Sequence, residues 1–133
     1  MKPITASIGQ VAYKTIIKSE THELIADEPE ALGGGGQGFS PSELLASSLA
    51  ACTAITLRMY ANRNQWEVEN IEVNVSLSFD QSDNSTKMHR EIILTGNLDE
   101  GQKTRMLNVA NKCPMHKTLS GSIVIDSTLS QIF

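Results

Sequence analysis

The 133-residue sequence contains few aromatic residues, two cysteines and no long uninterrupted apolar run. Aromatic residues make up only 5% of the chain, which leaves little material for the stacking platforms that bind single-stranded nucleic acids. The formal net charge of −4 gives no basis for binding nucleic acid or an anionic membrane surface. The most apolar region, residues 44–57, is interrupted by serine and threonine and is shorter than the roughly 20 apolar residues that span a bilayer. We therefore expect neither a nucleic-acid partner nor a membrane partner.

The start of the chain has no targeting signal that we can identify, because no apolar stretch follows its first lysine, Lys2. We therefore expect a cytoplasmic protein. In that compartment cysteines are more often reduced or redox-active than joined in permanent bridges. A length of 133 residues, with 40% apolar and 20% charged residues, predicts one soluble globular domain over residues 1–133.

The pattern of apolar residues predicts an α+β fold with the element order βββ-α-ββ-α-β. Strands are expected at residues 5–8, 11–17, 23–26, 68–79, 88–95 and 122–125, and helices at residues 40–62 and 99–112. Pro114 is expected to interrupt the second helix. Strands and helices cluster along the chain instead of alternating strictly, which favours α+β over a parallel doubly wound sheet.

The clearest local signal is the start of the helix at residues 40–62. Ser40 stands at the N-cap, Pro41 at the first helical position and Glu43 at the third, which is a capping box with the favoured proline. The glycine-rich residues 33–38 before it predict a turn into the helix, because no Gly-Lys-Ser/Thr follows to make a phosphate loop. Apolar and small residues then cover most of the helix and predict a long, buried, central element. One face is expected to carry Leu45, Leu49, Cys52, Thr56 and Met59.

The two cysteines are the main candidates for chemistry. Cys52 lies in the middle of the apolar helix, and Cys113 lies in the segment Asn-Lys-Cys-Pro-Met-His that ends at His116. Free cysteine is often an inert buried residue, and the sequence alone does not place the two thiols in contact. Cys113 and His116 offer only two metal ligands, whereas metal sites usually need three or four, so we expect no metal.

Two segments resemble the OsmC/Ohr family of thiol-dependent hydroperoxide reductases. One is the run GGGGQGFSPSELLASSLAAC that ends at Cys52, and the other is ANKCP, which contains Cys113. The Ser-Pro-x-Glu-Leu-Leu pattern is similar to the less-characterised OsmC-like branch. The resemblance implies the element order given above and an intertwined homodimer with active sites at the subunit interface. It also implies that no cofactor is needed beyond an external dithiol reductant.

By this resemblance Cys52 would attack the O–O bond of an organic hydroperoxide or hydrogen peroxide and become a sulfenic acid. Cys113 would condense with it to a disulfide, which a small dithiol would reduce. Both thiols must then come within disulfide range, a Cα separation of roughly 4.4–6.8 Å.

The family activates its helix cysteine with an N-terminal arginine held by a glutamate early in the helix, and this sequence departs from that pattern. No arginine precedes Arg58, so Lys14 is the nearest N-terminal cation, and it lacks the bidentate fork of arginine. Glu43 is the candidate glutamate, although it stands one position later after the proline than in the best-known peroxidases. Lys87, His89, Arg90 and Glu91 are expected to form a solvated strand face.

Two other functions stay open. The first is a non-peroxidatic protein on the same fold that binds a small apolar or electrophilic molecule near Cys52 or serves in a stress response. The second is a nucleophilic hydrolase with Cys52 as nucleophile and His116 as base.

Overall fold

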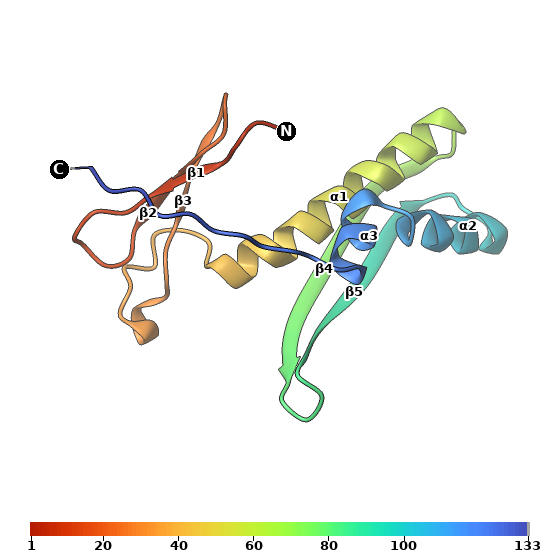
Figure 1. Cartoon of the computed structure of the whole chain (residues 1–133). Coiled ribbons are helices and arrows are strands. Elements are labelled where there is room, and N and C mark those ends of the chain that lie inside the picture. The colour runs from red at the N-terminus through yellow and green to blue at the C-terminus, as the bar shows by residue number, and fades with distance from the viewer. Residues whose placement is uncertain (133) are drawn as a thin grey trace. The chain divides into compact units, whose positions relative to one another are not determined.

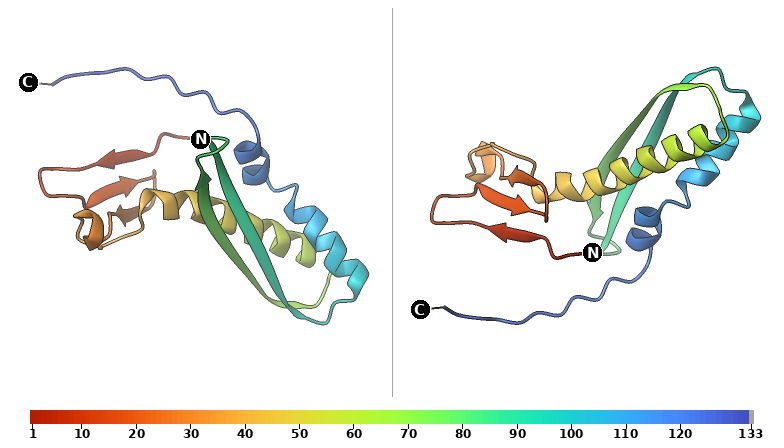
Figure 2. Two further views of the ribbon diagram at one scale, coloured as in Figure 1. Left: turned by 90° about the horizontal axis from the view of Figure 1, so that it is seen from below. Right: turned by 90° about the horizontal axis from the view of Figure 1, so that it is seen from above.

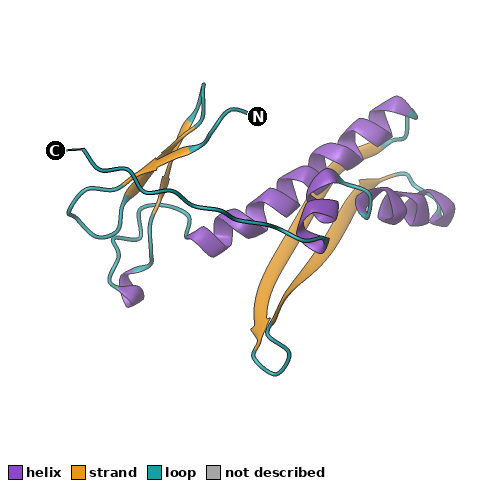
Figure 3. Ribbon diagram, in the orientation of Figure 1, coloured by secondary structure: helices purple, strands orange, loops and turns teal. Residues whose placement is uncertain are grey.

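The computed structural model describes residues 1–132 and confirms a mixed α+β fold (Figure 1, Figure 3). The strands and helices follow in the order β1 (Thr5–Ser7), β2 (Thr15–Lys18), β3 (Glu23–Ala26), the 3-10 helix η1 (Glu30–Leu32), α1 (Pro41–Arg63), β4 (Val68–Asp80), β5 (Ser85–Gly96), α2 (Glu100–Ala110) and α3 (Pro114–Ser120). The chain divides into two compact units, Met1–Ser48 with Ser76–His89, and Leu49–Val75 with Arg90–Phe133.

The first unit contains the antiparallel sheet β1-β2-β3, in which Thr5 pairs with Lys18 and Ile16 pairs with Ile25. The buried carboxylate of Asp27 follows this sheet and organises the glycine-rich loop. Its oxygens accept hydrogen bonds from the backbone amides of Glu28 at 2.8 Å, Gly35 at 3.3 Å and Gln37 at 3.2 Å. A carboxylate that accepts several amide hydrogens fixes the loop that leads into α1.

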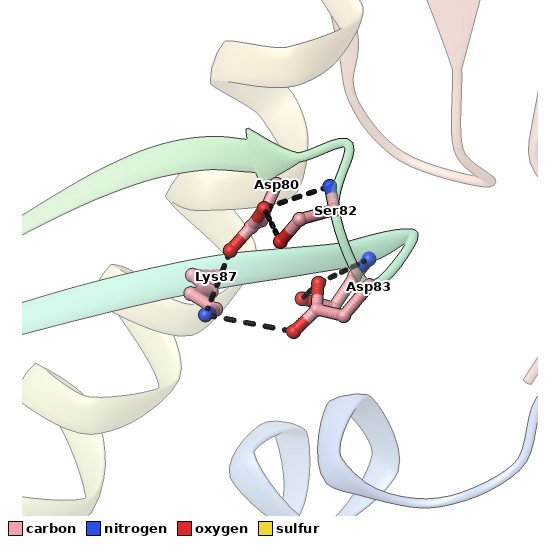
Figure 4. Close-up of polar contacts among 5 residues, drawn as sticks. Asp80, Ser82, Asp83 and Lys87 are labelled. Atoms are coloured by element: carbon pink, nitrogen blue, oxygen red, sulfur yellow. Dashed lines mark hydrogen bonds and ion pairs between the residues drawn. The ribbon is translucent and has the colours of Figure 1, made fainter.

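The tip of the β4–β5 hairpin, also in the first unit, is tied by two aspartates (Figure 4). Asp80 accepts hydrogen bonds from the amide and hydroxyl of Ser82, and Asp83 does the same for Ser85. Lys87 Nζ lies 3.2 Å from Asp80 and 3.7 Å from Asp83. These ion pairs are exposed and contribute little stability, about 0–1 kcal/mol each.

The N-terminus of α1 is capped as the sequence predicts. The Ser40 amide donates to Glu43 Oε1 at 2.9 Å, and the Glu43 amide donates to Ser40 Oγ at 3.2 Å. These hydrogen bonds satisfy two donors that the helix itself leaves unpaired.

The buried face of α1 differs from the predicted one. Leu49, Thr53, Leu57 and Ala61 are buried at intervals of four residues, whereas Leu45, Ile55 and Met59 are exposed within this single chain. The prediction of a wholly buried helix is therefore wrong for the isolated chain, because the hairpin and α2 cover only one stripe of it. By length and composition α1 could also cross a membrane, with mean hydropathy 1.4 over an 18-residue window. The apolar stretch of α1 is therefore longer than the residues 44–57 predicted from the sequence.

The core of the second unit joins α1, β4 and α2. Leu57 and Ala61 of α1 pack with Val68 of β4 and with Met106 and Ala110 of α2. The start of α2 is fixed by a second capping box, in which Asp99 accepts from the Gln102 amide and the Gln102 side chain accepts from the Asp99 amide. This packing sets the position of the carboxyl end of α2 relative to α1.

The end of the chain differs from the prediction. Residues 114–120 form a separate short helix, α3, because Pro114 is well suited to the first position of a new helix after ending the old one. The strand expected at 122–125 is absent from the described residues, where residues 121–132 leave α3 as an extended chain without a ladder partner (Figure 2, Figure 3). Ile123, Val124 and Ile125 in it are 60%, 92% and 82% exposed.

Candidate active site

The site is built in the second unit around Cys113, which lies between α2 and α3. Its side chain is fully buried, and its backbone amide donates to the Ala110 carbonyl at 3.2 Å. Cys113 is the N-cap of α3, and its sulfur accepts a hydrogen bond from the His116 amide at 3.3 Å. Pro114 is pre-set for the first helical position, so the Cys-Pro dipeptide itself directs the sulfur toward the first turn of α3.

Helix α1 brings the other cysteine region to the same place. Thr53 is fully buried, and its Oγ1 lies 3.9 Å from Cys113 Sγ while donating to the Leu49 carbonyl at 2.7 Å. Cys52, the preceding residue, is half-buried, and both cysteines are free thiols. The structure therefore brings together two segments that are 60 residues apart in the chain.

Arg90 of β5 completes the cluster. Its Nη1 donates to Thr53 Oγ1 at 3.0 Å and to the Ala110 carbonyl at 3.2 Å, and lies 4.0 Å from Cys113 Sγ. Its Nη2 donates to Asn111 Oδ1 at 2.8 Å. The prediction that Arg90 belongs to a solvated strand face is wrong, because it lies on the inward side of β5 with Ile92 and Leu94. Alternation could have identified it, since position 90 has the same parity as those two apolar residues.

These contacts determine the charge state that the site favours at Cys113. Burial raises the pKa of the Cys113 thiol, but the His116 amide, the hydroxyl of Thr53 and the thiol of Cys52 lower it. The positive charge of Arg90 lowers it further, and the net result is a pKa below the ordinary value for cysteine. The surroundings of Cys113 therefore stabilise its thiolate form relative to that of an ordinary cysteine.

Of the other predicted site residues, Glu43 and Lys14 belong to the first unit, and His116 lies beside Cys113. Glu43 belongs to the first unit, where its carboxylate is held by Ser40, whose amide and hydroxyl lower the pKa of Glu43. Lys14 also belongs to the first unit and lines a hollow on the β1-β2-β3 sheet with Lys18 and Glu23. His116 contributes its backbone amide to Cys113. Within residues 1–132, no group of three or more His, Cys, Asp or Glu residues is arranged to hold a metal ion.

Comparison with known proteins identifies a family. A family profile described as "OsmC-like protein" matches residues 34–128, a range that includes both cysteines and Arg90. The chain is also 32% identical over 98 residues to the organic hydroperoxide resistance protein OhrB of Bacillus subtilis (strain 168). That alignment covers 71% of this chain and 72% of the relative.

Solved structures agree with this assignment. The crystal structure of OhrB from Bacillus subtilis superposes with a TM-score of 0.60 at 28% identity, covering 90% of each chain. An OsmC-like protein from Mycoplasma pneumoniae gives a TM-score of 0.77 at 23% identity, covering 90% of this chain and 86% of the other. The second likeness shows that the two chains have the same fold.

Proposed function

Because the chain belongs to the OsmC-like protein family, we propose that it is a thiol-dependent peroxidase that reduces organic hydroperoxides or hydrogen peroxide. The observation that carries the proposal is the convergence of α1 at Cys52 and Thr53 with the buried Cys113 beside the guanidinium of Arg90. The name of the Bacillus subtilis relative supports a role in resistance to organic hydroperoxides.

The exposure of the two thiols supports the roles that the family resemblance implies for them. Cys52 is half-buried and open to a small substrate, whereas Cys113 is fully buried. The Cys52 sulfur takes the distal oxygen of the hydroperoxide, so the O–O bond breaks, an alcohol leaves and a sulfenic acid forms. Cys113 then attacks that sulfur, a disulfide forms and the sulfenic oxygen leaves as water. An external dithiol reduces the disulfide and is itself oxidised, so no bound cofactor is needed.

The mass of the intact protein tests this cycle. Reduced protein treated with one equivalent of cumene hydroperoxide should lose two hydrogens and should consume peroxide continuously when a dithiol is supplied. Cys113→Ser should stop at a Cys52 sulfenic acid that dimedone traps, and Cys52→Ser should consume no peroxide. Wild-type protein that neither loses two hydrogens nor consumes peroxide would rule out the cycle.

Activation of Cys52 is a separate part of the proposal. Glu43 remains our candidate for it, as the glutamate early in α1, and Lys14 is the N-terminal cation that would act with it. Glu43→Gln keeps an oxygen acceptor for the Ser40 amide but removes the charge, so it should slow the first step while leaving α1 capped. An unchanged rate of peroxide consumption in Glu43→Gln would remove Glu43 from the machinery.

We also propose that the protein is a homodimer and works in the cytoplasm, where dithiol reductants are available. Ile55 and Met59 are 54% and 60% exposed on α1, and the extended segment 121–132 exposes Val124 and Leu129 almost completely. An apolar helix face and an apolar extended segment without ladder partners are features that a second copy would cover. Light scattering should give a dimer, and Ile55→Glu with Met59→Glu should give a monomer. The same change at Leu107, which is exposed on α2, serves as the control.

A second candidate function is binding without turnover, favoured by one observation. A hollow of about 290 Å³ between β5 and α2 is lined by Ile92, Leu94, Met106 and Leu107, with the cations Arg90 and Lys103 beside them. Apolar walls with a few convergent polar groups are typical of small-molecule sites. A short aliphatic carboxylate such as octanoate should then raise the melting temperature of a protein that fails to consume peroxide.

A further inference from the structure

The charge of Arg90 is not balanced by any carboxylate in the part of the chain that the structure describes. The ion pairs among residues 1–132 join Lys2 to Glu20, Lys87 to Asp80 and Asp83, and Lys103 to Glu100. Arg90 is half-buried, and its partners Thr53, Ala110 and Asn111 offer only neutral oxygens. Because an inward-facing guanidinium without a counter-ion is costly, an anion is expected beside it. The only ionisable side chain that it contacts in this region is Cys113.

The hydrogen-bond inventory shows which groups serve the Cys113 sulfur. Thr53 has one hydroxyl hydrogen, which it donates to the Leu49 carbonyl, and its oxygen already accepts from Arg90. Thr53 therefore serves a Cys113 thiolate only by sharing its one hydrogen with the Leu49 carbonyl. The His116 amide and the Arg90 guanidinium, by contrast, can only donate. The His116 amide donates to the sulfur at 3.3 Å. Both hydrogens of Arg90 Nη1 are directed to Thr53 and Ala110, so Arg90 acts on the sulfur through its positive charge at 4.0 Å.

We propose that Arg90 is the positioning residue of the resolving step, supplying the fixed positive charge that holds Cys113 as a thiolate directed at Cys52. This inference rests on the proposed function for its catalytic consequence. The Cys113 thiolate attacks the sulfur of the Cys52 sulfenic acid, the S–S bond forms and the S–O bond breaks. Hydroxide leaves and takes a proton from solvent to become water. The oxidant is the hydroperoxide already consumed at Cys52.

The same arrangement predicts which sulfur of the disulfide the external dithiol attacks. An external dithiol reaches the half-buried Cys52 sulfur more easily than the fully buried sulfur of Cys113. Cys113 is then the leaving group, and a thiolate stabilised by Arg90 leaves faster than an unstabilised one. The mixed disulfide with the reductant should therefore form at Cys52.

The titratable and charged groups near Cys113 come from four parts of the fold. Helix α1 contributes the Cys52 thiol, β5 contributes Arg90, the turn between α2 and α3 contributes the exposed Lys112, and α3 contributes His116. Cys52 can be replaced by serine, and Lys112 and His116 have no side-chain contact with the Cys113 sulfur among the described hydrogen bonds. In a Cys52→Ser protein, Arg90 is thus the one charged group with a side-chain contact to the Cys113 sulfur among the described residues, and its effect on the titration of Cys113 can be measured by itself.

That titration is the first test. The ultraviolet absorbance of the thiolate is followed against pH in Cys52→Ser protein, alone and combined with Arg90→Met, Arg90→Lys or Arg105→Met. Arg90→Met should move the midpoint upward by about 1 pH unit, the lower end of the shifts that an opposite charge within about 4–6 Å produces, because Arg90 lowers the pKa of Cys113 less than the His116 amide does. Arg90→Lys should restore part of the shift. Arg105, which donates to Tyr60 on the surface, is the matched control and should leave the midpoint unchanged.

The second test is a single turnover with one equivalent of cumene hydroperoxide and both cysteines present. In Arg90→Met, Cys52 sulfenic acid should form at the wild-type rate but persist and be trapped by dimedone. A higher pKa lowers the fraction of Cys113 that is thiolate, but each thiolate is then a stronger nucleophile. Near neutral pH, disulfide formation should therefore slow only about three- to fourfold for each pH unit by which the midpoint rises. Asn111→Ala keeps the charge of Arg90 but removes one hydrogen-bond partner of its guanidinium. It should slow disulfide formation by a smaller factor, and it provides the test if Arg90→Met does not fold.

The outcomes separate this inference from the proposed function. An unchanged midpoint in both Arg90→Met and Asn111→Ala, or disulfide formation at the wild-type rate in both, would overturn the role of Arg90. If wild-type protein forms no sulfenic acid with any peroxide but Arg90→Met still shifts the midpoint, the peroxidase proposal fails. The charge pairing of Arg90 with Cys113 then stands on its own.

Discussion

Replacing Met106 tests whether α2 is anchored by the core that positions Cys113. Met106 is 1% exposed and packs against Leu57 and Ala61 of α1 and Val68 of β4. Met106→Ala removes three side-chain heavy atoms from a site that cannot collapse freely, because three elements meet there. Buried Met-to-Ala changes cost about 2–5 kcal/mol, and we expect about 3 kcal/mol here. For a chain of this size that corresponds to a fall of about 10 °C in melting temperature.

The neighbouring residue provides the control. Leu107 is 55% exposed on the same helix, so Leu107→Ala should cost about 1 kcal/mol, since only about half of its side chain leaves water on folding. Alanine favours the helix more than leucine or methionine does, and these two have nearly equal helix propensities. The stabilisation from introducing alanine is therefore the same in both variants and cancels when their free energies of unfolding are compared. The difference of about 2 kcal/mol therefore reports burial alone.

Urea unfolding followed by circular dichroism measures both variants. The protein concentration must be the same for each, because association would add to the apparent stability. Equal losses for Met106→Ala and Leu107→Ala, within about 0.5 kcal/mol, would refute the orientation of α2 and with it the placement of Cys113. A loss confined to Met106→Ala supports the packing that places Ala110 and Cys113 beside Arg90.

Three further predictions concern the first unit. Gly38→Ala should lower the melting temperature because its Cβ would collide with the Ile25 carbonyl oxygen, whereas Gly9→Ala, with nothing within 4 Å, should not. Asp27→Asn should destabilise the protein at neutral pH. Burial raises the pKa of Asp27 in the folded protein, but backbone hydrogen bonds lower it by more. The Asp27 carboxylate therefore stabilises the fold at pH values above its pKa in the unfolded chain, about 3.9. That difference between the melting curves should vanish as pH falls through the lower folded-state pKa. Ser40→Ala should cost about 1 kcal/mol in urea unfolding through loss of the cap.

The sequence predicted best those features that depend on interactions between residues close together in the chain. The capping box at Ser40 and Glu43 predicted the start of α1 to within one residue, because it uses side chains three residues apart. The start of α2 was also predicted to within one residue. The strand at 23–26 was predicted with its observed bounds, and the long alternating runs gave β4 and β5 to within three residues.

Features that depend on contacts between distant parts of the chain were harder to predict from the sequence. Ser122 to Ile125 has the composition of a strand, but a strand requires a ladder partner, and none lies beside it within residues 1–132. The buried face of α1 was also misassigned, because nearly every side of this helix is apolar or small. Only tertiary packing decides that Thr53 faces inward and Met59 outward.

The inward position of Arg90 was also not predicted from the sequence. Arg90 was expected to share a solvated strand face with its polar neighbours Lys87, His89 and Glu91. In a strand, however, neighbours in sequence face opposite sides, and Arg90 shares its side with Ile92 and Leu94. An arginine on an apolar strand face needs a polar destination, and here that destination is the carboxyl end of α2 and the Cys113 sulfur. A charged residue in phase with an apolar face is therefore the sequence feature that would have predicted the buried, positively charged environment of Cys113.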